Sequence, residues 1–245
     1  MKKIAFLLFG LIAVMAMSCQ TSGNGNQTQT NTVVDNQKLE ESVKQAVQKM
    51  MQMDMVDDME QMLTKDMLAL QNKALGVHFE GDYFQGFQWN TGVLDACSEE
   101  IETIIEGVKV VDSLHGDVEM RYVDKGCYDE PYTMHLLKED GQWKIDDVDY
   151  PETTLREQCK LFYEEVADWY RAASPEDIMD VFMNEEPSEE SYTEPSTIYC
   201  NNPKAVKTLI GEIRNNLELF KQNPNYTEDL GQKIEAMISR IETHL

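Results

Sequence analysis

The stretch that decides the fold is residues 117–148, which reads DVEMRYVDKGCYDEPYTMHLLKEDGQWKIDDV. Apolar and polar side chains alternate along three runs in it, as they do in strands with one buried face. The apolar positions are Val118, Met120 and Tyr122, then Tyr132, Met134 and Leu136, then Trp143 and Ile145. Short turns at Lys125-Gly126 and Asp140-Gly141 separate the runs, which predicts an antiparallel meander. A run from Glu102 with Ile104, Val108 and Val110 adds a preceding strand.

Helical periodicity comes before the meander. Between residues 35 and 73, apolar side chains recur at spacings of three and four, the pattern of one amphipathic helical face. Asp57-Asp58 predicts a break in this region, and Thr64 is a candidate cap of a further helix. Residues 74–89 then predict a glycine-punctuated loop whose aromatic side chains pack on the core.

Residues 151–245 have the pattern of helices. Thr154-Leu155-Arg156-Glu157 is a capping box, Ser174-Pro175 and Asn202-Pro203 are helix starts, and Thr227 is a further cap. The predicted fold is therefore α+β: N-terminal helices packed on an antiparallel β-meander over residues 35–150, followed by an all-helical region over residues 151–245. About 95 residues make a small separate core, so we expect the C-terminal helices to pack partly on the first domain.

Residues 35–150 resemble a known fold family. Helices, an aromatic loop and a meander ending in Gly141-Gln142-Trp143-Lys144-Ile145-Asp146 are similar to the nuclear-transport-factor-2-like, cystatin-like fold. More narrowly, the segment resembles an uncharacterised family of exported bacterial proteins whose last strand reads Gly-x-Trp-Lys-Ile-Asp. The resemblance implies an α+β domain and no particular activity, because the fold family includes enzymes, small-molecule binders and non-catalytic modules.

The N-terminus predicts export. Residues 1–18 hold two lysines and an apolar run that is too short to span a bilayer but suits a signal peptide. Ala16-Met17-Ser18-Cys19 resembles a bacterial lipobox, with Ala16 where Leu is usual, so Cys19 is the expected lipidation site. The alternative is an ordinary signal peptide with an incidental cysteine. Residues 19–34 then predict a lipidated cysteine and a flexible polar tether, which places the protein in the bacterial cell envelope, on either membrane.

The charge limits the partners. The chain has 21 basic and 45 acidic residues, a formal net charge of -24. Such a field repels phosphate backbones and anionic headgroups, so we expect no nucleic-acid partner and membrane attachment only through the lipid on Cys19. A protein or small-molecule partner is not specified by these observations.

Four cysteines remain after Cys19. An exported chain meets an oxidising compartment, so disulfides are permitted, and four cysteines allow three connectivities. Proximity favours Cys97–Cys127 and Cys159–Cys200, and four unpaired thiols are the alternative. Their spacing lacks a zinc pattern, and we expect no metal and no cofactor.

One constellation is a candidate for chemistry. His135 alternates onto a sheet face, and Asp147, Tyr122 and Trp143 are the other residues that a pocket there would use. A His–Asp pair in a pocket can transfer protons; the alternative is a satisfied or solvent-facing histidine. The methionines of residues 50–67 suit either Cu(I) or adaptable core packing, and packing is the simpler account.

We therefore expect an exported, lipid-anchored envelope protein with a non-catalytic binding or interaction role. The alternative is a small-ligand binder or enzyme that uses a pocket between the sheet and the helices. An open cavity at His135 favours the alternative, whereas an interior filled by side chains favours an interaction module.

Overall fold

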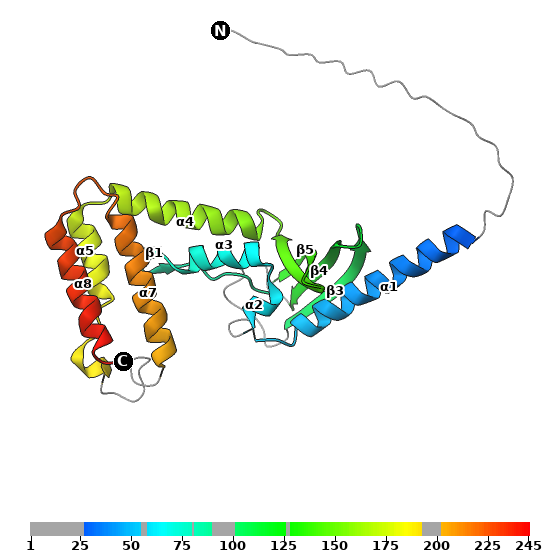
Figure 1. Cartoon of the computed structure of the whole chain (residues 1–245), viewed down its shortest axis with the longest axis horizontal. Coiled ribbons are helices and arrows are strands. Elements are labelled where there is room, and N and C mark those ends of the chain that lie inside the picture. The colour runs from blue at the N-terminus through cyan, green and yellow to red at the C-terminus, as the bar shows by residue number, and fades with distance from the viewer. Residues whose placement is uncertain (1–26, 55–57, 80, 90–100, 126–127, 193–201) are drawn as a thin grey trace, which may run out of the picture.

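The computed structural model of the chain describes residues 27–54, 58–79, 81–89, 101–125, 128–192 and 202–245 (Figure 1). Its helices are α1 (Gln27–Met50), α2 (Met59–Met62), α3 (Lys65–Leu75), α4 (Leu155–Ala172), α5 (Pro175–Asn184), the 3-10 helix η1 (Glu189–Tyr192), α7 (Pro203–Phe220) and α8 (Glu228–Glu242). Its strands are β1 (His78–Phe79), β2 (Asp82–Tyr83), β3 (Ile101–Val110), β4 (His115–Asp124), β5 (Tyr128–Glu139) and β6 (Gln142–Asp149). The fold is α+β with a helical C-terminal region, as predicted.

The main sheet is an antiparallel meander in the order β3-β4-β5-β6. The register places Val118 opposite Met134 and Met134 opposite Val148, so the apolar residues of successive strands lie on one face. That face carries the buried side chains of β4, β5 and β6, and α1 packs against it. The alternation that predicted the strands is confirmed, because one layer of helices needs one apolar face to cover. We call this part the sheet lobe.

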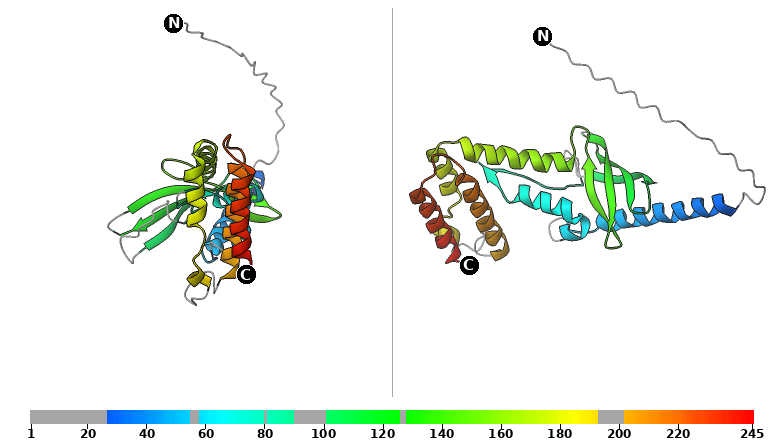
Figure 2. Two further views of the ribbon diagram at one scale, coloured as in Figure 1. Left: turned by 90° about the vertical axis from the view of Figure 1, so that its left-hand side faces the viewer. Right: turned by 45° about the horizontal axis from the view of Figure 1, so that its top comes forward.

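The C-terminal helices form a second core at the opposite end of the molecule (Figures 1 and 2). The second half of α4 packs there with α5, α7 and α8, and we call this part the helical lobe. The predicted caps are present. Thr154 and Glu157 form the capping box of α4, and the side chains of Ser174, Asn202 and Thr227 accept hydrogen bonds at the starts of α5, α7 and α8. These caps fix where each helix begins.

The boundary predicted at residue 150 does not separate the two cores. Leu155 and Cys159, at the start of α4, are buried in the core of the sheet lobe. In the other direction, Val77 lies in the core of the helical lobe. An 18-residue helix is about 27 Å long, enough for one helix to serve two cores. The C-terminal helices reach the first half of the chain through Val77–Phe79, so the two lobes interlock.

The predicted tether of residues 19–34 is partly helix. α1 begins at Gln27, eight residues earlier than the first expected helical residue, Asp35. Once Leu39, Val43 and Val47 have packed on the sheet, extending a nucleated helix backwards costs little, which explains why this polar segment joins it. The predicted signal peptide and Cys19 lie outside the described residues. Of the helices that are described, none combines the length and the apolar character needed to cross a membrane.

Candidate functional site

The four residues of the predicted pocket do not share a cavity. Tyr122 and Trp143 point to the inner face of the sheet and are buried in the core of the sheet lobe. His135 lies on the other face, where 37% of its side chain is exposed. The pocket of four residues is therefore not formed, because successive residues of a strand point to opposite faces and His135 lies between the inward-pointing Met134 and Leu136; of the other three residues, the register places only Asp147 opposite His135. Trp143 instead borders a shallow hollow beside α1, where its indole N–H donates to the Ser42 hydroxyl at 3.1 Å.

His135 is held between two carboxylates on the outer face. Its Nδ1 is 2.9 Å from an Asp117 oxygen, and its Nε2 is 3.0 Å from an Asp149 oxygen. Burial alone would lower the pKa of His135, but the hydrogen bonds to Asp149 and Asp117 outweigh it, and the pKa is raised above its usual value. The pair His135–Asp147 is not formed as a proton-transfer unit. This histidine is an ion-paired surface residue, the alternative that the sequence left open.

Asp147 supports the start of α4 instead. Its carboxylate accepts hydrogen bonds from the backbone N–H groups of Val148 and Arg156, at 2.9 and 3.1 Å. Arg156 also lies 3.8 Å from the same carboxylate and donates to Asp146 at 2.8 Å. A carboxylate at a helix N-terminus satisfies donors that the helix itself leaves open. Asp147 therefore ties β6 to α4.

The Cys159–Cys200 link is absent from the structure. Cys159 is a free thiol, fully buried in the core of the sheet lobe. Burial raises its pKa to about 12, which suppresses the reactive thiolate. The helical spacing that puts Cys159 on the apolar face of α4 also explains why it packs as a small apolar residue. Cys97, Cys127 and Cys200 lie outside the described residues, and the Cys97–Cys127 pair stays a prediction.

A cluster of polar side chains lies where the two lobes meet. The hairpin of β1 and β2 leaves the sheet lobe after α3 and inserts His78, which is fully buried, among α4, α5 and α7. The backbone of this segment is held by side chains of the helical lobe. The Asn215 amide donates to the Gly76 carbonyl at 2.9 Å, and the Tyr170 hydroxyl donates to the His78 carbonyl at 3.3 Å. These two hydrogen bonds hold the segment that contains the hairpin against α4 and α7.

The His78 side chain meets two carboxylates. Its Nε2 lies 3.0 Å from Glu185 Oε1, an oxygen that also accepts from the Tyr83 hydroxyl at 3.1 Å. Its Nδ1 lies 4.0 Å from Glu212 Oε2. The hydrogen bond with His78 holds the pKa of Glu185 below its usual value, whereas burial raises the pKa of Glu212. Two carboxylates with pKa values moved in opposite directions therefore face one buried imidazole.

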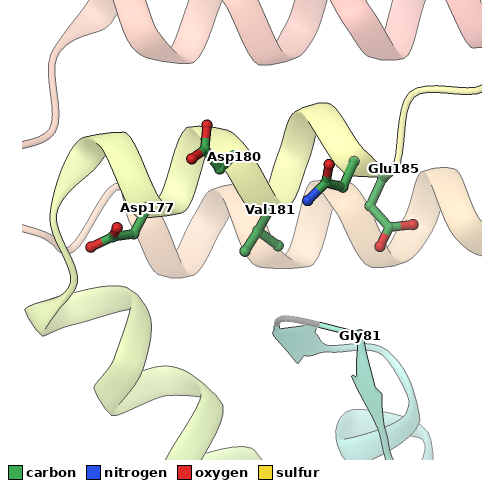
Figure 3. A pocket seen from close by; sticks show the side chains of 6 residues that line it. Gly81, Asp177, Asp180, Val181 and Glu185 are labelled. Atoms are coloured by element: carbon green, nitrogen blue, oxygen red, sulfur yellow. The ribbon is translucent and has the colours of Figure 1, made fainter.

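A cleft of about 420 Å³ opens next to this cluster (Figure 3). One wall is α5, from which Val181 and Glu185 extend towards the turn at Gly81. Asp177, Asp180 and Asn184 complete the lining. The cleft offers carboxylate and amide oxygens, the groups that accept hydrogen bonds from a donor on another molecule. The cleft borders the β1–β2 hairpin, because Gly81, at the tip of the hairpin, is one of its lining residues.

Sequence reasoning missed this junction. The sequence patterns that predict the strands and helices single out neither His78 nor Glu185 as a buried residue. In the structure only 17% of the Glu185 side chain is exposed. One signal was available: Asn216 stands three residues after Ile213 on the apolar face of the helix at residues 203–220, and a polar residue on such a face needs a buried partner.

No protein-family model, no curated protein and no solved structure matches the chain. The resemblance of residues 35–150 to the nuclear-transport-factor-2-like fold stays a prediction, and the α+β fold and the junction of its two lobes are the findings on which a function can be based.

Proposed function

We propose that the protein is an exported, lipid-anchored protein of the bacterial cell envelope with a non-catalytic binding or interaction role. The observation that carries the proposal is the filled interior of the sheet lobe. Met120, Met134 and Ile145 point from three strands into the space between sheet and helices, and each is fully buried. Side chains of these strands therefore pack together at the centre of the sheet lobe, and a hollow of about 310 Å³ lined by α1 and Trp143 lies beside them.

The length of α1 and the exposure of its first turns support the proposal that the protein is anchored to a membrane. Residues 35–38 of α1 are exposed, so the helix extends past the sheet before its apolar positions begin to pack. Its 24 residues correspond to about 36 Å. A lipid on Cys19 would therefore hold the lobes at a distance from the membrane through a helix, and the acidic surface would keep them off anionic headgroups.

The anchor is tested by Cys19→Ala. We expect this variant to move from the membrane fraction to the soluble fraction and to lose the mass of the lipid. Cys159→Ala is the matched control, because it removes a buried thiol and leaves the lipidation site intact. A Cys19→Ala protein that stays in the membrane fraction with unchanged detergent partitioning would contradict the anchor.

The non-catalytic role is tested by native mass spectrometry of the protein purified from its own membranes. We expect the mass of the lipidated chain without a retained small molecule. A small molecule retained at one copy per chain, and lost when the cores are unfolded, would instead favour a pocket-based ligand binder.

A further inference from the structure

The inner face of β5 continues beyond the core of the sheet lobe. Tyr132, Met134 and Leu136 are buried on this face, and the same alternation places Tyr128 and Glu130 on it, nearer the start of the strand. Both residues are half-buried. In the part of the chain that the structure describes, the Glu130 side chain has no ion-pair or hydrogen-bond partner. A half-buried carboxylate on an inner face, with no partner to offset the loss of hydration, suggests a site that a ligand completes.

A cleft of about 370 Å³ is lined by Tyr128 and Glu130. Tyr150 and Glu152, which follow β6, and Gln158, in the first turn of α4, line it as well. The Tyr150 hydroxyl donates to the Gln88 carbonyl at 3.4 Å, which fixes the position of its ring. Burial raises the pKa of Tyr150, so the phenol keeps its proton and the ring stays neutral. The volume lies in the lower part of the range of ~300–1,000 Å³ that is usual for small-molecule sites.

The chemistry of the lining selects the charge of a ligand. Glu152 is exposed at the rim and, among the described residues, lacks an ion-pair partner, as Glu130 does. No lysine or arginine is among the residues that line the cleft. An anion would be repelled by the two carboxylates, and a neutral ligand would cover Glu130 without compensating its charge. A cation is therefore the favoured ligand.

The tyrosine rings narrow the choice among cations. Ca²⁺ needs six to eight oxygen ligands, and within the described residues no group of three or more His, Cys, Asp and Glu side chains is placed to hold a metal ion. An ammonium group attached to carbon satisfies the cleft better. Its charge is attracted by the carboxylates and by the faces of the tyrosine rings, and its methyl or methylene groups pack on those rings.

We propose that this cleft binds a small organic cation, whose ammonium group is balanced by Glu130 and Glu152 and whose carbon atoms contact Tyr128 and Tyr150. The ligand class rests on the binding role proposed above and makes that role specific. The Gln158 amide supplies an acceptor and a donor for a further polar group of the ligand. Because Glu152 is exposed at the rim, the cation exchanges with solvent and is not retained through purification.

The test uses the full-length chain in detergent, labelled with ¹⁵N-tyrosine, and choline as the probe. The matched neutral probe is 3,3-dimethylbutan-1-ol, which has the shape of choline with carbon in place of the charged nitrogen. Shifts of the Tyr128 and Tyr150 amide signals, followed during each titration, give the two dissociation constants. We expect choline to bind roughly tenfold more tightly than the neutral alcohol, the equivalent of one charge-assisted contact.

Variants read at the Tyr150 signal locate the charge. Glu130→Gln keeps the shape of the side chain and should weaken choline roughly tenfold, with no effect on the neutral alcohol. Its thermal midpoint should not fall, because Glu130 has no partner to lose in the fold. Tyr128→Leu should also weaken choline, whereas Tyr128→Phe keeps the ring and should bind like the wild type. Glu119→Gln is the control: it removes one charge from the exposed outer face of the same sheet and should leave choline affinity unchanged.

Three results would each overturn the cation site. These are equal affinity for choline and the neutral alcohol, the absence of a saturable shift at both tyrosines, and equal weakening of choline by Glu119→Gln and Glu130→Gln, which would show attraction by the whole acidic surface. The fractionation of Cys19→Ala is unaffected by any of them, so the cation site and the membrane anchor can fail separately.

Discussion

Replacing Leu155 by Ala tests whether the two lobes unfold as one unit. Leu155 is the first residue of α4, and its side chain is fully buried in the core of the sheet lobe. The helix that it begins continues into the other core, where Val166 and Tyr170 are also buried. If α4 and the hairpin link the two cores, the cavity left by Leu155→Ala must also lower the stability of the helical lobe, although Leu155 is not part of that core.

The magnitude follows from burial. A fully buried Leu→Ala change costs about 2–5 kcal/mol, the sum of lost transfer free energy and the cavity that remains. With a urea slope of ~2–3 kcal/mol per M, a cost of ~3 kcal/mol lowers the unfolding midpoint by ~1 M. Ile241→Ala removes a fully buried side chain from the core of the helical lobe, and we expect it to lower the unfolding midpoint by a similar amount.

The assay is urea-dependent hydrogen exchange with mass spectrometry at about pH 7.5, which follows peptides from both lobes in one sample. We expect Leu155→Ala and Ile241→Ala each to lower the midpoint in both lobes. Leu161→Ala, at an exposed position of the same helix, should change neither midpoint. A Leu155→Ala protein whose sheet peptides lose stability while α7 and α8 keep the wild-type midpoint would refute the linkage and restore a domain boundary near residue 150.

Three smaller predictions follow from single contacts. Cys159 should resist alkylation in the folded protein at neutral pH and react once urea unfolds it, since its pKa is about 12 and it is buried; modification of the native thiol at the rate of a free peptide would contradict its burial. The pKa of His135 is raised in the fold, so its contribution to stability is present below ~6.5 and is lost as pH rises through the higher folded value; His135→Gln should lower the thermal midpoint at about pH 5.5 and have no effect at about pH 8.5. Asn223→Ala should cost ~1–3 kcal/mol in chemical denaturation, because it leaves two carbonyls at the end of α4 without their amide donor, whereas a loss below ~0.5 kcal/mol would show that water replaces it.

The sheet and the helix starts were predictable because they depend on neighbours in the sequence. Alternation along residues 117–148 placed Met120 and Met134 on one face, and the structure confirms both. The caps at Thr154 and Thr227 were likewise visible, since a cap bonds to a residue three positions away. Such local rules need no knowledge of the fold.

The candidate site was not predictable in the same way. His78 and Asn216 are separated by 138 positions, and their contact exists only because α3 and α4 place the hairpin inside the helical lobe. The pocket prediction was wrong for a different reason, which the sequence pattern itself contains. His135 and Trp143 were given one cavity although the period of two sends them to opposite faces, a conflict that the register between β5 and β6 makes plain. Pairwise placement across the chain has to be known before buried polar partners can be assigned.

The division of α4 between two cores has a consequence for how the gene can change. Phe162, near the middle of the helix, packs against both cores, so each end of the helix has a fixed rotational phase relative to the other. Inserting one residue there would twist every later residue by ~100° about the helix axis and advance it by ~1.5 Å, turning Tyr170 away from the hairpin carbonyl that it binds. Seven inserted residues nearly restore the phase but lengthen the rod by ~10 Å, beyond the reach of the hairpin. Length changes within this helix are thus excluded by geometry, and the chain can vary in length only where a loop can absorb both the turn and the advance.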